Sequence, residues 1–229
     1  DMNMNLPKGA RVGFVGSTGS GKSTALDLLM GLLIPTEGEI LIDGLPVNGY
    51  RGRAWQRSIA HVPQSIYLSD NTLAANIAFG VPLEEIDMSR VQQAAQQAQI
   101  ADFIESRPEG YKVFVGERGI RLSGGQRQRI GIARALYKQA CVLLFDEATS
   151  ALDNTTEREV MRAIEGLGGD LTILLIAHRI TTVRHCDTIV ELDQGRIVMQ
   201  GTYEQLLDNS PSFRKMVKME EESQHEPNA

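Results

Sequence analysis

Two glycine-rich segments of this chain have the residue types and spacing that bind phosphate. The first, Gly16-Ser17-Thr18-Gly19-Ser20-Gly21-Lys22-Ser23, has the pattern G-x-x-x-x-G-K-[ST]. In such a loop the backbone N–H groups cradle phosphate oxygens, the lysine neutralises charge and the last hydroxyl ligates Mg²⁺. The second, Leu122-Ser123-Gly124-Gly125-Gln126, lies where we expect a helix to begin, so its N–H groups and the positive end of the helix dipole favour another anion.

One nucleotide rarely needs two such segments. The economical explanation is that two copies of the chain face each other head to tail. Each nucleotide would then lie between the glycine loop of one copy and the Ser123-Gly124-Gly125 segment of the other.

The apolar runs predict an α/β fold with a mostly parallel sheet. Continuous apolar runs over 142–145 and 172–177 are typical of strands buried on both faces. Glu147 and His178 follow just past the ends of these strands, which is where open α/β sheets bind ligands. The other predicted strands are 10–16, 39–42 and 58–62, with a terminal hairpin of 189–192 and 196–199. A helix is expected from Lys22 to Leu33, ended by Pro35.

Between Gln64 and Asp146 the pattern changes from strands to helices. Helices are predicted over 72–79, 88–105 and 125–137. A later helix is expected to begin at a capping box of Thr156 with Glu159 and to end at Gly168-Gly169. These elements predict a discontinuous core of residues 1–70 and 139–219, an inserted helical subdomain of residues 71–138, and a polar, acidic, disordered tail of residues 220–229.

Composition limits the class of protein. The chain has 229 residues and a formal net charge of −6, from 23 Lys+Arg against 29 Asp+Glu. This balance argues against a nucleic-acid binder that relies on a basic surface. No stretch approaches the ~20 apolar residues of a membrane span, and no N-terminal segment has the pattern of a signal peptide. The two cysteines, Cys141 and Cys186, give no disulfide framework and suit a reducing cytoplasm.

Taken in order, these segments resemble the nucleotide-binding domain of an ATP-binding cassette (ABC) transporter. The resemblance extends from Asp1 to about Val217. It identifies 16–23 as Walker A, Gln64 as the Q-loop glutamine, 122–126 as the ABC signature, 141–147 as Walker B, 150–153 as the D-loop and His178 as the switch histidine. A lone glycine-loop match is weak, but chance does not easily produce all of these segments in the order of the family.

The resemblance implies a P-loop NTPase (RecA-like) α/β core with a mostly parallel sheet, antiparallel β elements and an inserted helical subdomain. It also implies ATP and Mg²⁺ as ligands. The expected nucleotide contacts are Gly16, Ser17, Thr18, Gly19, Ser20, Gly21, Lys22, Ser23, Thr24, Ser123, Gly124, Gly125, Gln126 and Asp153. The expected magnesium ligands are Ser23, Gln64 and Asp146, and the expected catalytic residues are Lys22, Gln64, Glu147 and His178.

Each role has a simpler alternative. Glu147 is expected to polarise the attacking water, because phosphoryl transfer needs positioning and charge neutralisation, but Asp146-Glu147 could be a solvated acidic pair. Gln64 could be a simple loop glutamine, and His178, the expected γ-phosphate contact, could be a buried core histidine. Asp153 is expected to be structural at the dimer seam more than catalytic.

Several segments resemble the exporter branch of the family. Val115-Gly116-Glu117-Arg118-Gly119 resembles the exporter X-loop, which touches the membrane domain, although Glu117 and Arg118 could also form a solvated ion pair. The segments 64–68 and 76–80 resemble exporters that flip lipid-linked oligosaccharides and polysaccharides. The implied partners are a second ABC ATPase domain and a transmembrane domain, and the implied location is the cytoplasmic side of a membrane, the inner membrane in a bacterium.

The chain departs from the exporter pattern at one point. Exporters carry an aromatic residue upstream of Walker A that stacks on the adenine, and no candidate precedes Gly16. The resemblance therefore implies that this residue lies upstream of Asp1, in a longer polypeptide with an N-terminal membrane domain.

Other function classes fit less well. A nucleotide-gated module that dimerises with little turnover is the main alternative, and the presence of Glu147 and His178 argues against it. An ABC ATPase of DNA repair or chromosome organisation would need a long coiled-coil insertion between the motifs, and this sequence has none.

Overall fold

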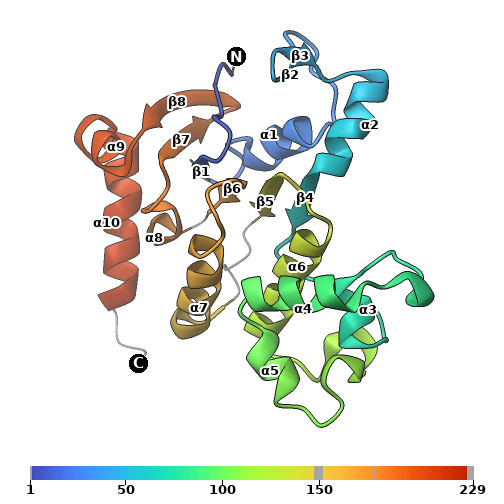
Figure 1. Ribbon diagram of the computed structural model, residues 1–229. Coiled ribbons are helices and arrows are strands. Elements are labelled where there is room, and N and C mark those ends of the chain that lie inside the picture. Colours follow the sequence, from blue (N-terminus) through green and yellow to red (C-terminus); the bar gives the residue numbers. More distant parts are fainter. Residues whose placement is uncertain (1, 147–151, 178, 226–229) are drawn as a thin grey trace.

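The structure is a computed structural model that describes residues 2–146, 152–177 and 179–225. A six-stranded sheet in the order β4-β5-β6-β1-β7-β8 forms its centre (Figure 1). All neighbouring pairs are parallel except β7 and β8, which form the predicted antiparallel hairpin. The strands are β1 (Arg11–Val15), β4 (Ile59–Val62), β5 (Val142–Asp146), β6 (Thr172–Ile176), β7 (Thr188–Asp193) and β8 (Arg196–Gly201), with a small separate hairpin of β2 (Leu41–Ile42) and β3 (Leu45–Pro46).

Helices cover both faces of the sheet. The α-helices are α1 (Lys22–Leu29), α2 (Gly49–Ser58), α3 (Leu73–Ile77), α4 (Met88–Gln97), α5 (Ala101–Glu105), α6 (Gly124–Tyr137), α7 (Asn154–Glu165), α8 (Ile180–Val183), α9 (Tyr203–Asn209) and α10 (Pro211–His225). Short 3₁₀ turns occur at Leu83–Glu85, Gly110–Lys112 and Glu117–Gly119. Within the described residues, no helix is both long enough and apolar enough to cross a membrane.

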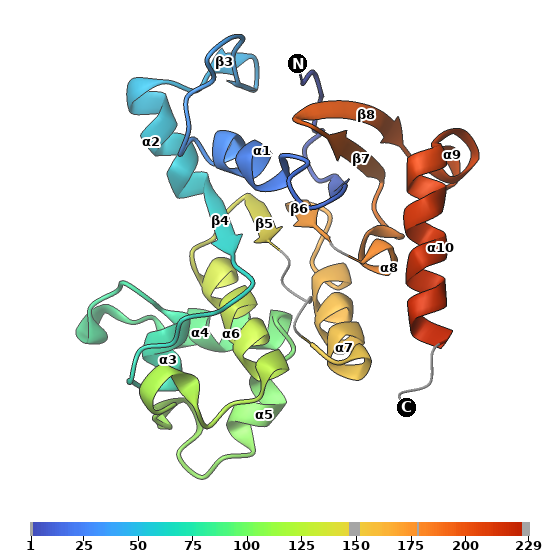
Figure 2. The same ribbon diagram turned by 180° about the vertical axis from the view of Figure 1, so that it is seen from behind.

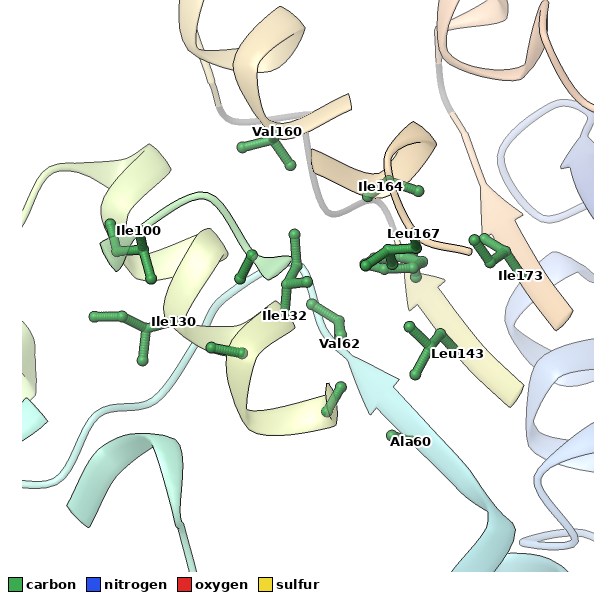
Figure 3. Close-up of a cluster of buried hydrophobic side chains, with 14 of the residues drawn as sticks. Ala60, Val62, Ile100, Ile130, Ile132, Leu143, Val160, Ile164, Leu167 and Ile173 are labelled. Atoms are coloured by element: carbon green, nitrogen blue, oxygen red, sulfur yellow. The ribbon is translucent and has the colours of Figure 1, made fainter. Parts of the chain in front are cut away.

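The alternation of side chains along the central strands divides the core into two layers. Leu143 of β5 and Ile173 of β6 face one layer, where they meet Ile132 of α6 and Ile164 of α7 (Figure 3). The alternate side chains along β5 and β6 face the opposite layer, which contains Leu26 of α1. Because both faces are covered, β6 is buried along its whole length. The predicted α/β class with a mostly parallel sheet is confirmed.

Some element boundaries predicted from the sequence are wrong. The first helix ends at Leu29 and not at Leu33, because Gly31 adopts a positive φ of 67° and ends the helix before Pro35. The helix predicted over 88–105 is two helices, since Gln99 has a φ of 53° between α4 and α5. The strand predicted over 39–42 is limited to β2.

The beginning and end of α7 also differ from the prediction. The residue that caps its N-terminus is Asp153, so the capping box predicted for Thr156 and Glu159 is wrong. The helix ends at Glu165, with Gly166 as its cap, and not at Gly168-Gly169.

The predicted disordered tail is partly helical. Helix α10 runs to His225, so the described part of the segment 220–229 is helical, and its expected disorder stays a prediction. The acidic composition of this segment concealed a contact of Glu220 with the N-terminus of α8.

Candidate functional site

The glycine loop follows β1 and leads directly into α1. Gly16 has a φ of 147°, and a Cβ there would lie 2.2 Å from the Leu192 carbonyl oxygen and 2.7 Å from Ser20 Oγ. Gly21 has a φ of 101° at the N-cap of α1. Only glycine fits the first position without displacing backbone, and the second needs a conformation that glycine adopts readily. The two glycines therefore fix the shape of the loop.

The N-terminus of α1 is suited to an anion. Its N-cap, Gly21, has no side chain to accept from the first N–H groups, and the first turn contains no acidic residue. The backbone N–H groups and the positive end of the helix dipole therefore face the loop uncompensated by a carboxylate. Ser23 and Thr24 lie exposed in this first turn. This arrangement fits the phosphates of a nucleotide.

Lys22 supplies a positive charge to the loop. Its side chain is only 6% exposed, and Nζ donates to the carbonyl oxygens of Gly16 at 2.7 Å and Ser17 at 3.0 Å. A buried ammonium within a glycine loop is a strong local attraction for a phosphate.

Asp146 ends β5, at the carboxyl edge of the sheet that also carries the glycine loop. Its carboxylate is 31% exposed and lies 4.0 Å from His61 Nε2 on the neighbouring strand β4. Burial holds the pKa of His61 below its ordinary value, although the carboxylates of Asp146 and Asp27 oppose this shift. The sequence argument did not identify His61, because its proximity to Asp146 depends on the pairing of β4 with β5.

Gln64 lies just past the end of β4, and its side chain is exposed. Its backbone carbonyl accepts a hydrogen bond of 2.6 Å from Gln128 Nε2, a buried side chain on α6. The Q-loop candidate is therefore attached to the helix that begins with the signature segment.

The signature segment begins α6 with a reciprocal capping box. Ser123 Oγ accepts from the Gln126 N–H at 3.2 Å, and Gln126 Oε1 accepts from the Ser123 N–H at 2.8 Å. A Cβ on Gly125 would lie 2.1 Å from Thr156 Cγ2, and a Cβ on Gly124 would lie 3.0 Å from Leu152 Cδ2. The two glycines therefore allow α6 to approach the beginning of α7 closely.

The structure does not bring the signature segment to the glycine loop of the same chain. In both views α1 lies above β4 and β5, whereas the beginning of α6 lies below them (Figures 1 and 2). Lys22 and Asp146 lie on one edge of the sheet, and Gln64 follows the adjacent strand end. Ser123, Gly124, Gly125 and Gln126 begin α6, whose Gln128 lies against the Gln64 carbonyl, and this end of α6 lies on the other side of β4 and β5 from α1.

Asp153 has a structural role within the chain. Its Oδ1 accepts from the Thr155 and Thr156 N–H groups at 3.0 Å each, and its Oδ2 accepts from Thr156 Oγ1 at 2.6 Å. Hydrogen bonds from the side chain and backbone of Thr156 hold the pKa of the Asp153 carboxyl below its usual value. Its expected contact with a nucleotide stays a prediction.

Glu147 and His178 lie outside the described residues, so their expected catalytic roles stay predictions. The structure describes the residues on either side of His178. The Ala177 N–H donates to the Phe14 carbonyl oxygen at 3.2 Å, which joins the end of β6 to β1 just before the glycine loop. Arg179 pairs with Glu157 of α7, another contact that the sequence argument missed.

The chain is similar to known transport proteins along almost its whole length. A profile of the family described as ABC transporter matches residues 1–150. The ATP-dependent lipid A-core flippase of Cupriavidus metallidurans is 43% identical over 224 residues, which cover 97% of this chain and 38% of that protein. The flippase of the same name from Saccharophagus degradans is 50% identical over 211 residues, covering 92% of this chain and 36% of that protein.

A solved structure supports the same relationship. The structure of a bacterial Atm1-family ABC exporter with ATP bound superimposes with a TM-score of 0.84 at 40% identity, covering 98% of this chain and 38% of that one. This chain thus spans little more than a third of the length of these relatives. The resemblance predicted from the order of the motifs is confirmed, and the chain belongs to the ABC transporter family.

Proposed function

We propose that this chain is the ATP-binding and hydrolysing domain of an ABC exporter. The observation that carries the proposal is the glycine loop, in which Lys22 Nζ lies 2.7 Å and 3.0 Å from loop carbonyls at the N-terminus of α1. Loop N–H groups and Lys22 bind the phosphates, and the phosphates replace the loop carbonyls as acceptors for Nζ. The residues of the core, 1–70 and 139–219, bind and turn over the nucleotide, while 71–138 carries the signature segment.

The residues present fit a magnesium ion held together with phosphates. Ser23 offers an exposed hydroxyl in the first turn of α1, and Asp146 offers a partly exposed carboxylate at the end of β5. Mg²⁺ commonly binds to one or two protein oxygens together with waters and phosphates, so this sparse donor set suits it. When bound, the ion neutralises charge that develops on the transferred phosphoryl group.

Two copies of the chain are needed to complete each site. The proposal rests on the distance between the two anion-binding segments, since α1 and the beginning of α6 lie on opposite sides of β4 and β5. A head-to-tail pair puts Ser123 and Gly125 of one copy against the nucleotide held by Lys22 of the other. Glu147 polarises the attacking water, and Gln64 and His178 orient it and the γ-phosphate.

The whole transporter, of which this chain is the nucleotide-binding part, is proposed to move a sugar-bearing lipid. The support is the name of the relatives, lipid A-core flippases, and the share of about a third that this chain spans of their length. The domain then works at the cytoplasmic face of the membrane. When ATP closes the head-to-tail pair, the movement is transmitted to a membrane domain. Exposed apolar side chains on either side of the X-loop, Phe114 and Ile120, offer a surface for that partner.

The test is release of inorganic phosphate from Mg-ATP by the wild type and by Glu147→Gln. The amide keeps the shape of the carboxylate and loses the base, so we expect ATP binding to persist while hydrolysis falls by about a hundredfold or more. An ATP-bound dimer should accumulate in the variant. Wild-type turnover in a folded Glu147→Gln protein would remove Glu147 from this role. A wild type that binds ATP and dimerises but releases no more phosphate than the variant would instead support the nucleotide-gated module.

A further inference from the structure

Helix α10 presents a carboxylate on its packed face. Phe213, Val217 and Glu220 follow one another at the i, i+4, i+7 spacing of one helix face. Phe213 is fully buried and Val217 is buried, whereas Met219, on another face, is 58% exposed. Glu220 is therefore directed towards the body of the domain, next to α8, which lies beside α10 in both views (Figures 1 and 2).

The Glu220 carboxylate binds the beginning of α8. One oxygen, Oε2, accepts from the Ile180 N–H, and the other accepts from Thr181 Oγ1 at 2.8 Å and from the Thr181 N–H at 3.4 Å. Hydrogen bonds to an ionised acceptor are stronger than neutral ones, and a carboxylate is favoured at a helix N-terminus. These residues are separated from Glu220 by about 40 positions in sequence, so the contact fixes two distant parts of the chain together.

A second carboxylate holds the same segment from another helix. Glu157, buried in the first turn of α7, accepts from Arg179 Nη1 and from Thr182 Oγ1 at 3.0 Å. Residues 179–182 are therefore held by α7 through Glu157 and by α10 through Glu220. The held segment begins immediately after His178.

We propose that Glu220 is a positioning residue for nucleotide hydrolysis, through which α10 holds the segment that follows His178. The proposal rests on the proposed function, because it assumes that residue 178 contacts the γ-phosphate. Glu220 itself touches no nucleotide. Without the Glu220 carboxylate, the N-terminus of α8 is released from α10 while Glu157 still holds the segment to α7, so we expect hydrolysis to slow and the domain to stay folded.

The first measurement is steady-state hydrolysis of Mg-ATP by the 229-residue chain carrying Glu220→Ala. Small misplacements of a catalytic group have large effects on rate, so we expect kcat to fall about tenfold. KM should change less than about twofold, because the loop at Gly16–Lys22 that binds the phosphates is unaffected. Glu220→Gln keeps one acceptor oxygen and should have an intermediate kcat.

The matched control is Glu222→Ala, which removes the same charge from an exposed position two residues along α10. We expect its kcat to equal that of the wild type. If Glu220→Ala and Glu222→Ala have the same kcat, the proposal is wrong. It is equally wrong if Glu220→Ala lowers thermal stability while kcat stays at the wild-type value, because α10 would then serve only to stabilise the fold.

A second measurement does not depend on hydrolysis. Hydrogen–deuterium exchange of the Ile180 and Thr181 amides should be faster in Glu220→Ala than in the wild type and unchanged in Glu222→Ala. Unchanged exchange at both amides would overturn the proposed hold. If the wild type releases no phosphate, the proposed function fails, and the exchange result still decides whether Glu220 holds this segment.

Thr181→Val serves if Glu220→Ala does not fold. It removes the hydroxyl that donates to Glu220 at 2.8 Å and keeps the carboxylate in place. We expect a smaller fall in kcat, about threefold, with KM unchanged. A wild-type kcat for Thr181→Val, in a chain whose Glu220→Ala variant cannot fold, would contradict the proposal.

Discussion

Gly13 allows helix α8 to lie directly on β1, the strand that leads into the glycine loop. A Cβ at this position would lie 2.6 Å from Val183 Cγ1 and 2.7 Å from Val183 Cβ, on the short helix α8. The branched side chain of Val183 is stiff and buried, so it cannot move aside easily. The close contact therefore joins the conformation of α8 to that of β1.

Gly13→Ala should therefore destabilise the domain. Overpacking of a filled core costs about 1–3 kcal/mol, and we expect the free energy of unfolding in urea to fall by this amount. Gly168→Ala is the matched control, because a Cβ there meets nothing within 4 Å and the residue is exposed. Its free energy of unfolding should stay within about 0.5 kcal/mol of the wild-type value. Equal stability of the two variants would mean that α8 can move away from β1 at little cost.

At the scale of residues, the sequence indicates candidate motifs but not the contacts that join distant parts of the chain. Gly16 to Ser23 could be identified because the chemistry of phosphate binding dictates both residue type and spacing. Glu157 and Glu220 could not, since each is an ordinary helix carboxylate in sequence and gains its role only from folding against residues 179–182. A local sequence pattern cannot indicate a contact between residues so far apart in the chain.

Helix α6 is attached by its side chains to the backbone that runs alongside it. Lys138 Nζ donates to the Gln56 carbonyl at 2.9 Å and to the Ile59 carbonyl at 2.5 Å, at the beginning of β4. Arg134 donates to the Tyr67 and Asn76 carbonyls at 3.1 Å and 3.0 Å, beyond the end of β4. Together with the hydrogen bond from Gln128 to the Gln64 carbonyl, these contacts hold α6 against the segment 56–76.

Lys138→Met tests the C-terminal attachment of α6. Methionine keeps much of the apolar stem but loses a charged donor to two carbonyls, so we expect the free energy of unfolding to fall by about 1–3 kcal/mol. Lys215→Met, at an exposed position of α10, is the control. A difference between the two variants smaller than about 0.5 kcal/mol would show that the Lys138 hydrogen bonds contribute no net stability.

At the scale of elements, the apolar pattern indicated the six strands of the central sheet and several helices, but it missed α2, α8, α9 and α10 and gave some boundaries wrongly. Ala98 and Ile100 are fully buried, as they would be in one continuous helix, so nothing in their pattern indicated the break at Gln99. The break is a left-handed residue just after the C-cap of α4, where the Gln99 N–H donates to the Gln96 carbonyl and the Ile100 N–H to the Ala95 carbonyl, each at 3.0 Å. The early end of α1 at Gly31 had a signal in the glycine itself, but the apolar residues beyond it favoured a longer helix.

At the scale of the whole molecule, one chain holds two glycine-rich segments, each at a helix N-terminus, that do not face each other. The sequence predicted both segments, and from them a second copy, but it could not predict their positions, which depend on where 71–138 packs below the sheet. Because the two segments lie apart in one chain, the dimer hypothesis makes a specific prediction for mixtures of two variant chains. Defects in the two segments of different chains should fall on the same site of a mixed dimer.

Mixing a Lys22→Ala chain with a Ser123→Asp chain should restore part of the hydrolysis that each lacks alone. In the mixed dimer one site carries both defects and the other carries neither. Aspartate is the better substitution at Ser123, because it caps a helix as well as serine does and its charge repels phosphate. The fold of α6 should therefore survive while nucleotide binding across the seam is lost, and thermal unfolding of each variant checks this.

The control is a mixture of Lys22→Ala with the double variant Lys22→Ala/Ser123→Asp, in which every site lacks the lysine and no recovery is expected. Native mass spectrometry in the presence of Mg-ATP establishes that mixed dimers form in both mixtures. Phosphate release that recovers only in the first mixture supports sites shared between chains. Mixed dimers without recovery would mean that Lys22 and Ser123 do not serve opposite sides of one nucleotide, and the second helix N-terminus would then need another anion to explain it.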